Sequence, residues 1–435
     1  MTRAPHAYRT IQVPESRRDE VFELDRLAFA LTADPEVDAV VPDTLDWDRT
    51  MAVEQADGQL CAVHASHRFS LAVPGSAVAC AGLTWVGVRP DHRRRGLLTS
   101  MIATHFDRSL ARGEPVSALF AAEAGIYGRF GYGSAADNLR LTVPRGAALR
   151  PVAGSAELDL RLESADEAAH GALIHDLHEA AASTRPGWIA RTPTLLRSRH
   201  LADPRAWRDG AEQLRIAVVS DASEVRGYAL FRRKESWSSP AGPTGTVRVS
   251  EVAALDPAAT HRLWSFLLDL DLMTTVESPM LATDDALVSL LVNARAAAGR
   301  VSDNLWVRLL DLPVALGARR YATPLDVVLE VTDSALPANA GRWHVRTDPS
   351  GTSGTAVTAD TVADGGFGHP AEVRATDAPA DLTVDVRELG AAYLGGRSLA
   401  ALASAGLVVE HRAGALLRTS AAFGWPVAPV CGWVF

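Results

Sequence analysis

The sequence predicts two tandem α/β units followed by a smaller α+β unit. Its 435 residues are too many for one ordinary hydrophobic core, and 47% of them are hydrophobic and 22% charged, as in folded globular proteins. Strand-like and helix-like patterns alternate through the first two thirds of the chain, and the outline of the first part recurs in the second. We therefore expect domains at residues 1–150, 151–318 and 319–435.

Composition narrows the class of protein. The net charge of −9 disfavours nucleic acid and anionic membranes as partners and favours cationic small molecules. Cys61, Cys80 and Cys431 are far apart, and the 13 histidines show no metal-binding spacing, so neither a metal site nor a disulfide framework is expected. The chain shows neither an apolar signal-peptide core nor a run of about 18 apolar residues. We expect a cytoplasmic protein.

The first unit begins with a helix and continues into strands. Apolar residues at helical spacing predict a helix over residues 20–31. An acidic stretch at 34–48, broken by prolines, predicts a surface loop or short helices. Three short runs typical of β-strands follow at 59–65, 68–73 and 78–88.

A strand, a basic loop, a helix and another strand then follow one another up to residue 120. The helix is predicted to begin at Gly96 and to end at Gly113, because apolar side chains recur on one side between these glycines. The strand after it is expected at 116–120. This order is typical of α/β domains that bind a nucleotide or CoA.

The second unit repeats this order without the basic loop. Before its second helix the chain has Asp256-Pro257-Ala258-Ala259-Thr260, so we interpret this unit as a copy that has lost cofactor binding. The third unit, from about Tyr321, has a different pattern and predicts a small α+β domain. Helices are expected at 167–181, 261–272, 386–394 and 398–405, and strands at 214–220, 225–232, 246–254, 327–331 and 382–384.

The segment VGVRPDHRRRGLLT, residues 86–99, has the features of a binding site for a pyrophosphate-containing cofactor. Free backbone N–H groups at a helix N-terminus lie at the positive end of the helix dipole and bind pyrophosphate. Gly96 lets the backbone approach a phosphate, and the preceding arginines add charged donors. Val86, Gly87 and Val88 leave strand backbone groups for an extended, amide-bearing arm such as pantetheine. The alternative is a solvated basic loop before a core helix, but the complete order of elements favours a CoA site.

The loop resembles the acetyl-CoA motif of the GNAT acetyltransferases, Arg/Gln-x-x-Gly-x-Gly/Ala. The chain fills it as Arg93-Arg94-Arg95-Gly96-Leu97-Leu98, with Leu98 in place of the usual small residue. Together with GIYGRFGYG at 125–133, the longer string resembles the Eis (enhanced intracellular survival) family. Residues 249–275 are similar to the second, cofactor-free GNAT domain of that family, and the chain also ends on a phenylalanine, Phe435.

The resemblance implies two GNAT domains, a sterol-carrier-like C-terminal domain and a homo-oligomer, which is a hexamer in several members. It implies acetyl transfer from acetyl-CoA to a primary amine, in characterised members that of an aminoglycoside. Tyr127 would be the general acid, the α-carboxylate of Phe435 the general base, and Trp85 a wall of the acceptor cavity. Residues implied to hold acetyl-CoA are Val86, Gly87, Val88, Arg93, Arg94, Arg95, Gly96, Leu97, Leu98 and Thr99, with Ala122 and Glu123 near the pantetheine end.

General chemistry supports one of these two catalytic roles and leaves the other open. A tyrosine with a pKa near ~10 is protonated at neutral pH and can donate to a thiolate whose conjugate acid has a pKa near ~8.5. Tyr132 competes with Tyr127 for this role, and either tyrosine could simply pack in a Gly-rich turn. An α-carboxyl pKa near ~3.5 is low for a base. The Phe435 carboxylate therefore either accepts the proton or anchors the ammonium, unless the chain end is an ordinary frayed terminus.

The sequence leaves open which class of amine receives the acetyl group. Aminoglycoside-acetylating members place an acid near the chain end, whereas this chain has Val434 there. A polyamine would then depend on acids elsewhere, for which Asp34, Glu36 and Asp38 are the candidates. The alternatives are acetylation of a protein lysine or a metabolite amine, or an acetyl-CoA-binding sensor without catalysis.

Overall fold

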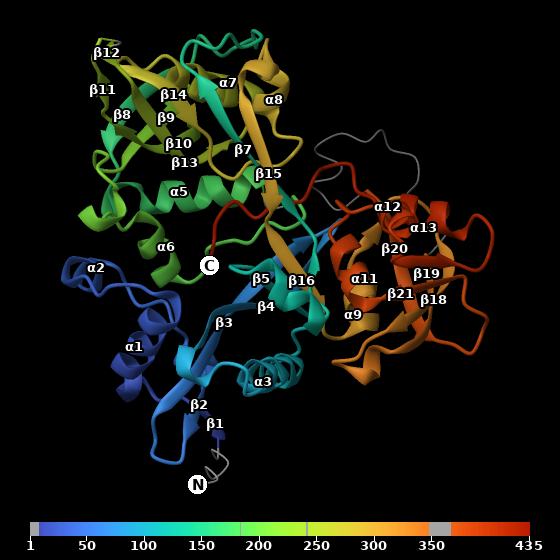
Figure 1. The fold of residues 1–435 in the computed structure, drawn as a ribbon. Coiled ribbons are helices and arrows are strands. Elements are labelled where there is room, and N and C mark those ends of the chain that lie inside the picture. Colours follow the sequence, from blue (N-terminus) through green and yellow to red (C-terminus); the bar gives the residue numbers. More distant parts are fainter. Residues whose placement is uncertain (1–7, 183, 241, 348–366) are drawn as a thin grey trace.

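The computed structural model describes residues 8–182, 184–240, 242–347 and 367–435, and three β-sheets organise them (Figure 1). Two sheets have seven strands and one has six, and helices pack against each of them. The expected order of two α/β units and one α+β unit is therefore found. Within these ranges no helix is both long and apolar enough to span a bilayer.

The first sheet has the order β1-β2-β3-β4-β5-β16-β6, with β4 and β5 parallel and the other neighbours antiparallel. Its strands are β1 (Tyr8–Gln12), β2 (Met51–Gln55), β3 (Leu60–Val73), β4 (Ser76–Val88), β5 (Val116–Phe120), β16 (Leu305–Leu309) and β6 (Gly133–Ser134). Its helices are α1 (Arg18–Phe29), α2 (Pro35–Val40), α3 (Leu97–Ala111) and α4 (Ala124–Tyr127).

One strand prediction in this sheet was wrong. The runs at 59–65 and 68–73 form a single strand, β3, because Ser66 and His67 continue the ladder opposite Leu83 and Gly82 of β4. Both polar side chains are buried, which the polar interruption in the sequence did not indicate.

The second sheet has the order β15-β7-β14-β13-β10-β9-β8. Its strands are β15 (Ala298–Asp303), β7 (Asp137–Pro144), β14 (Met273–Glu277), β13 (Gly245–Ala254), β10 (Val225–Lys234), β9 (Arg215–Ser220) and β8 (Asp159–Ser164), and a small hairpin pairs β11 (Trp237–Ser238) with β12 (Gly242–Pro243). Its helices are α5 (Glu167–Ala182), α6 (Thr194–Leu201), α7 (Pro257–Leu268) and α8 (Ala286–Leu290). The helix expected at 261–272 begins at Pro257 instead, because the Asp256 side chain caps it there, and ends at Leu268.

The two sheets exchange strands. β7 follows directly on the first sheet in the chain but pairs with β14 and β15 in the second. Conversely, β16 follows the second sheet in the chain but pairs with β5 and β6 in the first. The exchange ties the two sheets together and brings the loops at their facing ends close to each other (Figure 1).

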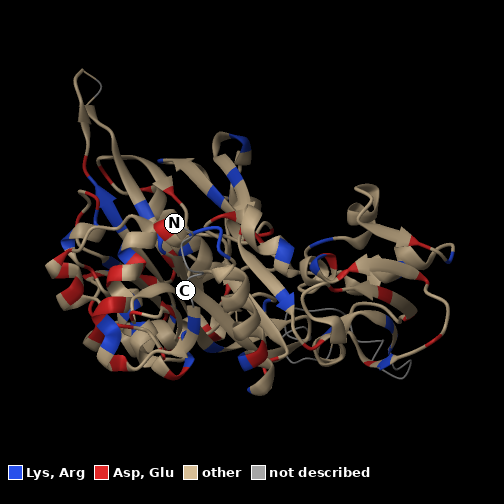
Figure 2. Ribbon diagram, turned by 60° about the horizontal axis from the view of Figure 1, so that its bottom comes forward, with Lys and Arg blue, Asp and Glu red and all other residues tan. Residues whose placement is uncertain are grey.

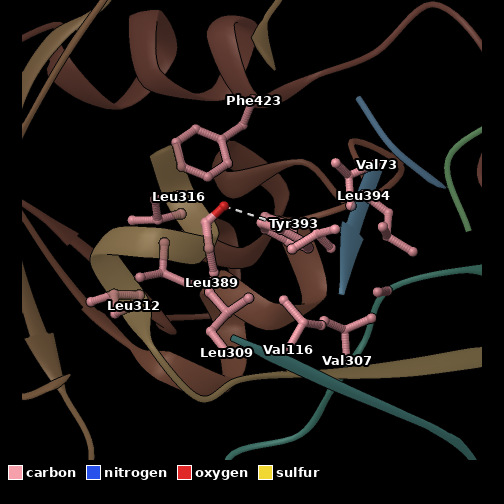
Figure 3. Close-up of a cluster of buried hydrophobic side chains, with 14 of the residues drawn as sticks. Val73, Val116, Val307, Leu309, Leu312, Leu316, Leu389, Tyr393, Leu394 and Phe423 are labelled. Atoms are coloured by element: carbon pink, nitrogen blue, oxygen red, sulfur yellow. Dashed lines mark hydrogen bonds between the residues drawn. The ribbon is translucent and has the colours of Figure 1, made fainter. Parts of the chain in front are cut away.

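The third sheet has the order β17-β20-β19-β18-β21-β22 and shares a core with the first sheet. In Figure 3, Val116 and Val307 of the first sheet belong to the same buried cluster as Leu316, Leu389 and Tyr393. The strands are β17 (Arg320–Tyr321), β18 (Asp326–Thr332), β19 (Gly341–Thr347), β20 (His369–Ala375), β21 (Leu382–Asp385) and β22 (Val408–Glu410), and the helices are α9 (Leu312–Ala318), α11 (Val386–Ala392), α12 (Leu399–Ser404) and α13 (Ala415–Phe423). This shared core fixes the C-terminal part of the chain against the first sheet.

Candidate active site

β4 and β5 separate in the middle of the first sheet. Their parallel pairing comprises Cys80 with Val116, Ala81 with Ser117 and Gly82 with Ala118, although β4 continues to Val88. The rest of β4 therefore faces an opening on the β5 side. Backbone groups of Val86, Gly87 and Val88, three of the predicted residues, lie on this part of the strand.

A β-bulge in β4 accounts for the separation. Val63 of β3 lies opposite Gly87, but Ala65 lies opposite Thr84, so β4 contains one extra residue. Trp85, within the bulge, has a φ of 55°, a left-handed conformation that is rare for a bulky residue. A bulge bends its strand and increases the local twist, which carries β4 away from β5.

The basic loop ends at the open N-terminus of α3. Gly96 is the N-cap residue with a φ of 80°, and no side chain caps this helix. A Cβ atom added at Gly96 would meet nothing within 4 Å, so the backbone conformation, not lack of space, selects glycine. Leu97 is buried and Thr99 exposed, so the predicted contacts of this turn would come from backbone N–H groups.

The three arginines of the loop differ in their contacts. Arg95 donates to the hydroxyl of Tyr8 at 2.9 Å and to the backbone oxygen of Asp91 at 3.0 Å, so it holds the loop in shape. Arg93 and Arg94 are exposed, and neither forms a hydrogen bond or ion pair through its side chain within the described part of the chain. These two guanidinium groups are the ones available to a phosphate.

Tyr127 lies at the end of α4, shortly after β5. Ala122 and Glu123, exposed, connect this helix to the strand. Burial, with a smaller contribution from the Glu123 carboxylate, raises the pKa of Tyr127 to about 12. Its hydroxyl is therefore protonated at neutral pH, and no described residue forms a hydrogen bond with it.

Tyr132 is already engaged in the core. Its ring is fully buried, and its hydroxyl forms a 2.8 Å hydrogen bond with Ser117 Oγ, which also contacts His105 Nε2 at 2.8 Å. The rings of Tyr132 and Tyr127 pack edge to face with centroids 5.9 Å apart. Of the two tyrosines, Tyr127 has the hydroxyl that is free to donate.

Phe435 lies where β4 and β5 separate. Its ring packs against Phe120, the last residue of β5, at 5.4 Å and against Phe69 of β3 at 4.8 Å between centroids. A Cβ added at Gly82, the last residue of β4 that pairs with β5, would come within 3.1 Å of this ring. Tyr127 instead packs with Leu83 and Leu119, whose side chains point to the opposite face because strand side chains alternate. Phe435 and Tyr127 thus flank the opening from its two faces.

The C-terminal residues are tethered. Asn304, 1% exposed, donates from Nδ2 to the Cys431 oxygen at 3.0 Å and accepts from the Cys431 nitrogen at 2.8 Å. The indole of Trp433 donates to the Ile189 oxygen at 2.7 Å, and Val430 N donates to the Pro186 oxygen at 3.0 Å. The chain end is therefore not frayed. Sequence reasoning missed Asn304, which has no motif around it.

A cavity of about 600 Å³ opens beside Phe435 and is lined by residues of both the first and the second sheet's domains. The predicted residue Trp85 lines it, as does Phe435. Other side chains that line the cavity are those of Asp25, Phe29, His67, Arg199, His200, Trp207, Ser250 and Trp433. About half of these come from the second sheet and its helices, so residues distant in the sequence build one cavity.

Two ionisable side chains of the cavity, those of Asp25 and His67, were not predicted. Burial, partly opposed by Arg26 and Arg199, raises the pKa of the Asp25 carboxyl to about 6. Burial lowers the pKa of His67 to about 4, so this imidazole is neutral at pH 7. Asp25 belongs to the helix predicted at 20–31, but nothing in the sequence indicates that this helix borders a site.

Asp34 and Glu36 do not line this cavity. The Asp34 side chain caps α2 by accepting from the backbone nitrogens of Glu36 and Val37. Glu36 accepts from the Arg205 nitrogen at 3.1 Å. Both acids therefore have structural contacts where the sequence suggested substrate contacts.

Two further observations concern metals and thiols. Among the residues that the structure describes, no group of three or more His, Cys, Asp or Glu side chains is placed to hold a metal ion. Cys61, Cys80 and Cys431 are buried and free, and burial raises the pKa of all three thiols. None of these thiols is poised as a nucleophile.

Comparisons with known proteins identify the domains of the chain and its relatives. Residues 8–135 and 187–309 each match a family model described as an acetyltransferase (GNAT) domain, and residues 312–432 match a sterol carrier protein domain. An uncharacterized N-acetyltransferase of Streptomyces coelicolor is 41% identical over 88% of both chains. The N-acetyltransferase Eis of Mycobacterium bovis is 34% identical over 81% of this chain and 80% of its own. The crystal structure of Eis1 from Mycobacterium abscessus superposes with a TM-score of 0.78 at 30% identity, covering 99% of this chain and 100% of that one.

Proposed function

The chain belongs to the Eis family of GNAT N-acetyltransferases, as its motifs predicted, and we propose that it acetylates a primary amine of a small molecule bound beside Phe435. Two GNAT domains and a C-terminal sterol-carrier-like domain are present, and the protein is an acetyl-CoA-dependent N-acetyltransferase. We assign catalysis to residues 1–150, a cofactor-free role to 151–318, and to 319–435 the delivery of the chain end to the site.

One observation carries the proposal: the last residue of the chain lies where β4 and β5 separate, and it lines the cavity. The opening between the strands suits the extended arm of acetyl-CoA, and the cavity suits a second substrate. The two substrates would meet beside the α-carboxylate of Phe435. A terminus held by Asn304 has a defined position there.

The residues around the opening fit acetyl-CoA, which supplies an activated acetyl thioester when bound. The uncapped N-terminus of α3 and the exposed Arg93 and Arg94 would hold the pyrophosphate. The free edge of β4 at 86–88 would pair with the pantetheine amides. Ala122 and Glu123, exposed beside the end of β5, would border its far end.

Tyr127 and Phe435 divide the proton chemistry. The Tyr127 hydroxyl holds its proton at neutral pH and donates it to the leaving thiolate, whose conjugate acid has a pKa near ~8.5. An ordinary α-carboxylate, with a pKa near ~3.5, is a weak base, so we assign the Phe435 carboxylate mainly the role of anchoring the incoming ammonium. Loss of the ammonium proton to water then frees the nucleophilic amine.

The acceptor class has two candidates. An aminoglycoside-like polyamine follows from the family resemblance and is supported by Asp25 and the terminal carboxylate, two acids at the cavity. A metabolite amine is supported by Arg199, a cation on the same wall. A protein lysine would have to reach the chain end through the cavity mouth.

The test is thiol release from acetyl-CoA with aminoglycosides, polyamines, amino acids and lysine peptides as acceptors. The enzyme keeps its native C-terminus and is compared with a variant one glycine longer and with Tyr127→Phe. The added residue displaces the carboxylate by about 3.5 Å, and we expect each variant to lose about 100-fold or more in kcat. An N-terminally extended enzyme is the control. Wild-type turnover by the glycine-extended variant would contradict the role of Phe435, and bound acetyl-CoA without any release would indicate a sensor.

We also propose a cytoplasmic location and a homo-oligomer, with a hexamer as the expected form. The free, buried cysteines support the location, since a reducing compartment keeps thiols unpaired. The family resemblance supports the assembly. Fractionation of the source cells and light scattering coupled to size-exclusion chromatography test the two statements. A monomeric mass would refute the second.

A further inference from the structure

Arg199 is a cation on the cavity wall that forms no ion pair within 4.0 Å in the described part of the chain, although the Asp25 and Asp43 carboxylates act on it at longer range. It lies on α6 and lines the cavity, and its guanidinium lies over the Trp207 ring at 5.2 Å from the centroid. Within the described residues no carboxylate comes within 4.0 Å of it, whereas other arginines of this region are paired, such as Arg191 with Glu251 at 2.8 Å. Its planar donors are therefore available to a ligand.

Other residues of α6 make its hydrogen-bonded and apolar contacts with the fold. The Nε of the neighbouring Arg197 donates to the Arg191 oxygen at 2.8 Å. Leu196 supplies the buried apolar contact of the helix. Arg199 faces a cavity, lies against an aromatic ring and forms no ion pair with a carboxylate of the described fold. An arginine in this setting can bind an anion.

The other charges of the cavity have the opposite sign. Asp25 on α1 and the α-carboxylate of Phe435 belong to the first and third domains, whereas Arg199 belongs to the second. Aromatic side chains, among them Trp85 and Trp433, form much of the remaining lining. The cavity thus combines two carboxylates, one guanidinium and flat apolar walls.

We propose that the acceptor is an amine that also carries a carboxylate or another anionic group on an aromatic or apolar body, with Arg199 binding the anion. The proposal rests on the proposed function and replaces the polyamine as the acceptor class. The Phe435 carboxylate anchors the ammonium, and Arg199 forms a bidentate pair with the acid. A polycation would instead bring further positive charges beside an unpaired guanidinium, which acts against its binding.

Matched probes isolate the contribution of the anion. 4-(Aminomethyl)benzoate and benzylamine share the reacting amine and the ring and differ only in the carboxylate. We expect the wild-type enzyme to favour the carboxylated probe in kcat/KM by roughly 10- to 100-fold, the range of a charge-assisted contact. Arg199→Gln should lose this preference through a higher KM for the acid, and Arg199→Lys should keep part of it.

Arg205→Gln is the matched control, because Arg205 is exposed, lies near Arg199 in the sequence and does not line the cavity. It removes the same charge and should keep the wild-type preference. Equal turnover of the two probes by the wild type, or faster turnover of kanamycin than of the acid, would overturn the proposal. An unchanged preference in Arg199→Gln would overturn it as well.

A binding measurement separates this proposal from the proposed function. Calorimetric titration of 4-(aminomethyl)benzoate into the protein saturated with CoA needs no turnover. Arg199-dependent binding supports the anion site even if no probe is acetylated, in which case only the proposed catalysis fails. Equal binding of both probes to the wild type would refute the anion site while leaving acetyl transfer intact.

Discussion

The two GNAT domains each have a bulged central strand, β4 or β13, but the helices that follow these strands begin differently. β4 has its extra residue near Trp85, and β13 has one at Ser250, since Leu230 and Phe231 lie opposite Glu251 and Val249. Both strands continue past their parallel neighbour. The helices that follow differ: α3 has no side-chain cap, whereas Asp256 Oδ1 accepts from the Ala259 nitrogen in α7 at 2.9 Å.

The protein's own carboxylate therefore occupies the position in the second domain that an anion would take in the first. Asp256 also pairs with Arg226 at 2.8 Å, so its charge is neutralised within the fold. This difference between α3 and α7 indicates that the bulged strand is common to both domains. Anion binding instead depends on whether the first turn of the following helix is capped. In Figure 2, Lys and Arg are interspersed with Asp and Glu along the ribbon.

A second difference lies beside the bulge of β13. Glu251 is buried there between Arg191 and Tyr228, and the Arg191 guanidinium lies 5.8 Å from the Trp433 ring centroid. The corresponding part of β4 is open. The second domain thus has a buried ion pair beside its bulge, and the arginine of this pair also contacts Trp433 near the chain end.

Arg191→Met should give the largest effect, because it leaves the Glu251 carboxylate buried without its partner. We expect the free energy of unfolding to fall by about 3–5 kcal/mol. Urea denaturation measures this loss. The double variant with Glu251→Gln removes the stranded charge and should recover a large part of the stability. A single variant as stable as the wild type would show that the ion pair does not support this domain.

Gly96→Asp transfers the acidic cap of α7 to α3 and is the most direct way to break the comparison. We expect acetyl-CoA to bind about 10- to 30-fold more weakly, because the carboxylate competes with the pyrophosphate for the same N–H groups. Equilibrium dialysis with labelled acetyl-CoA provides the measurement. Gly96→Ala, which has the same backbone strain but no charge, is the control and should lose less affinity.

Asp256→Ala removes the cap in the second domain. We expect the protein to lose about 1 kcal/mol of stability, as for other N-caps, with kcat/KM unchanged. No second acetyl-CoA should bind, because Pro257 has no N–H group and no arginine loop precedes it. Thermal denaturation and a binding stoichiometry give the two results. Binding of two acetyl-CoA molecules per chain would mean that the Asp256 cap alone prevents acetyl-CoA from binding to the second domain.

The smallest effect concerns Asp25, which lies where the two domains meet. Its pKa of about 6 lies above the 3.8 of an exposed aspartate, so the carboxylate gains its charge as the pH rises through 6. The KM for a cationic amine should therefore fall about 3- to 10-fold between pH 5 and pH 7. Asp25→Asn should flatten this part of the profile, which initial rates at constant ionic strength would show. A variant with the wild-type profile would assign the titration to another group.

Local patterns in the sequence were sufficient for several elements and for the basic loop before α3. The segment from β4 to α3 is continuous in the chain, and its alternation of apolar residues, its arginines and Gly96 are local signals. The helix predicted at 20–31 and the strand at 116–120 are α1 and β5 for the same reason. β3 was divided in two because Ser66 and His67, polar in the sequence, are buried only through their pairing with β4.

The sequence by itself thus determined the family, the order of the three domains and the loop that follows β4, because each depends on neighbouring residues. Only the tertiary structure decided the cavity, which joins Asp25, Arg199 and Phe435 from three domains. It also decided the strand exchange and the two hydrogen bonds between Asn304 and Cys431. The residues involved are far apart in the chain. Contacts of this kind depend on how buried surfaces of different domains pack together, and no local periodicity records that packing.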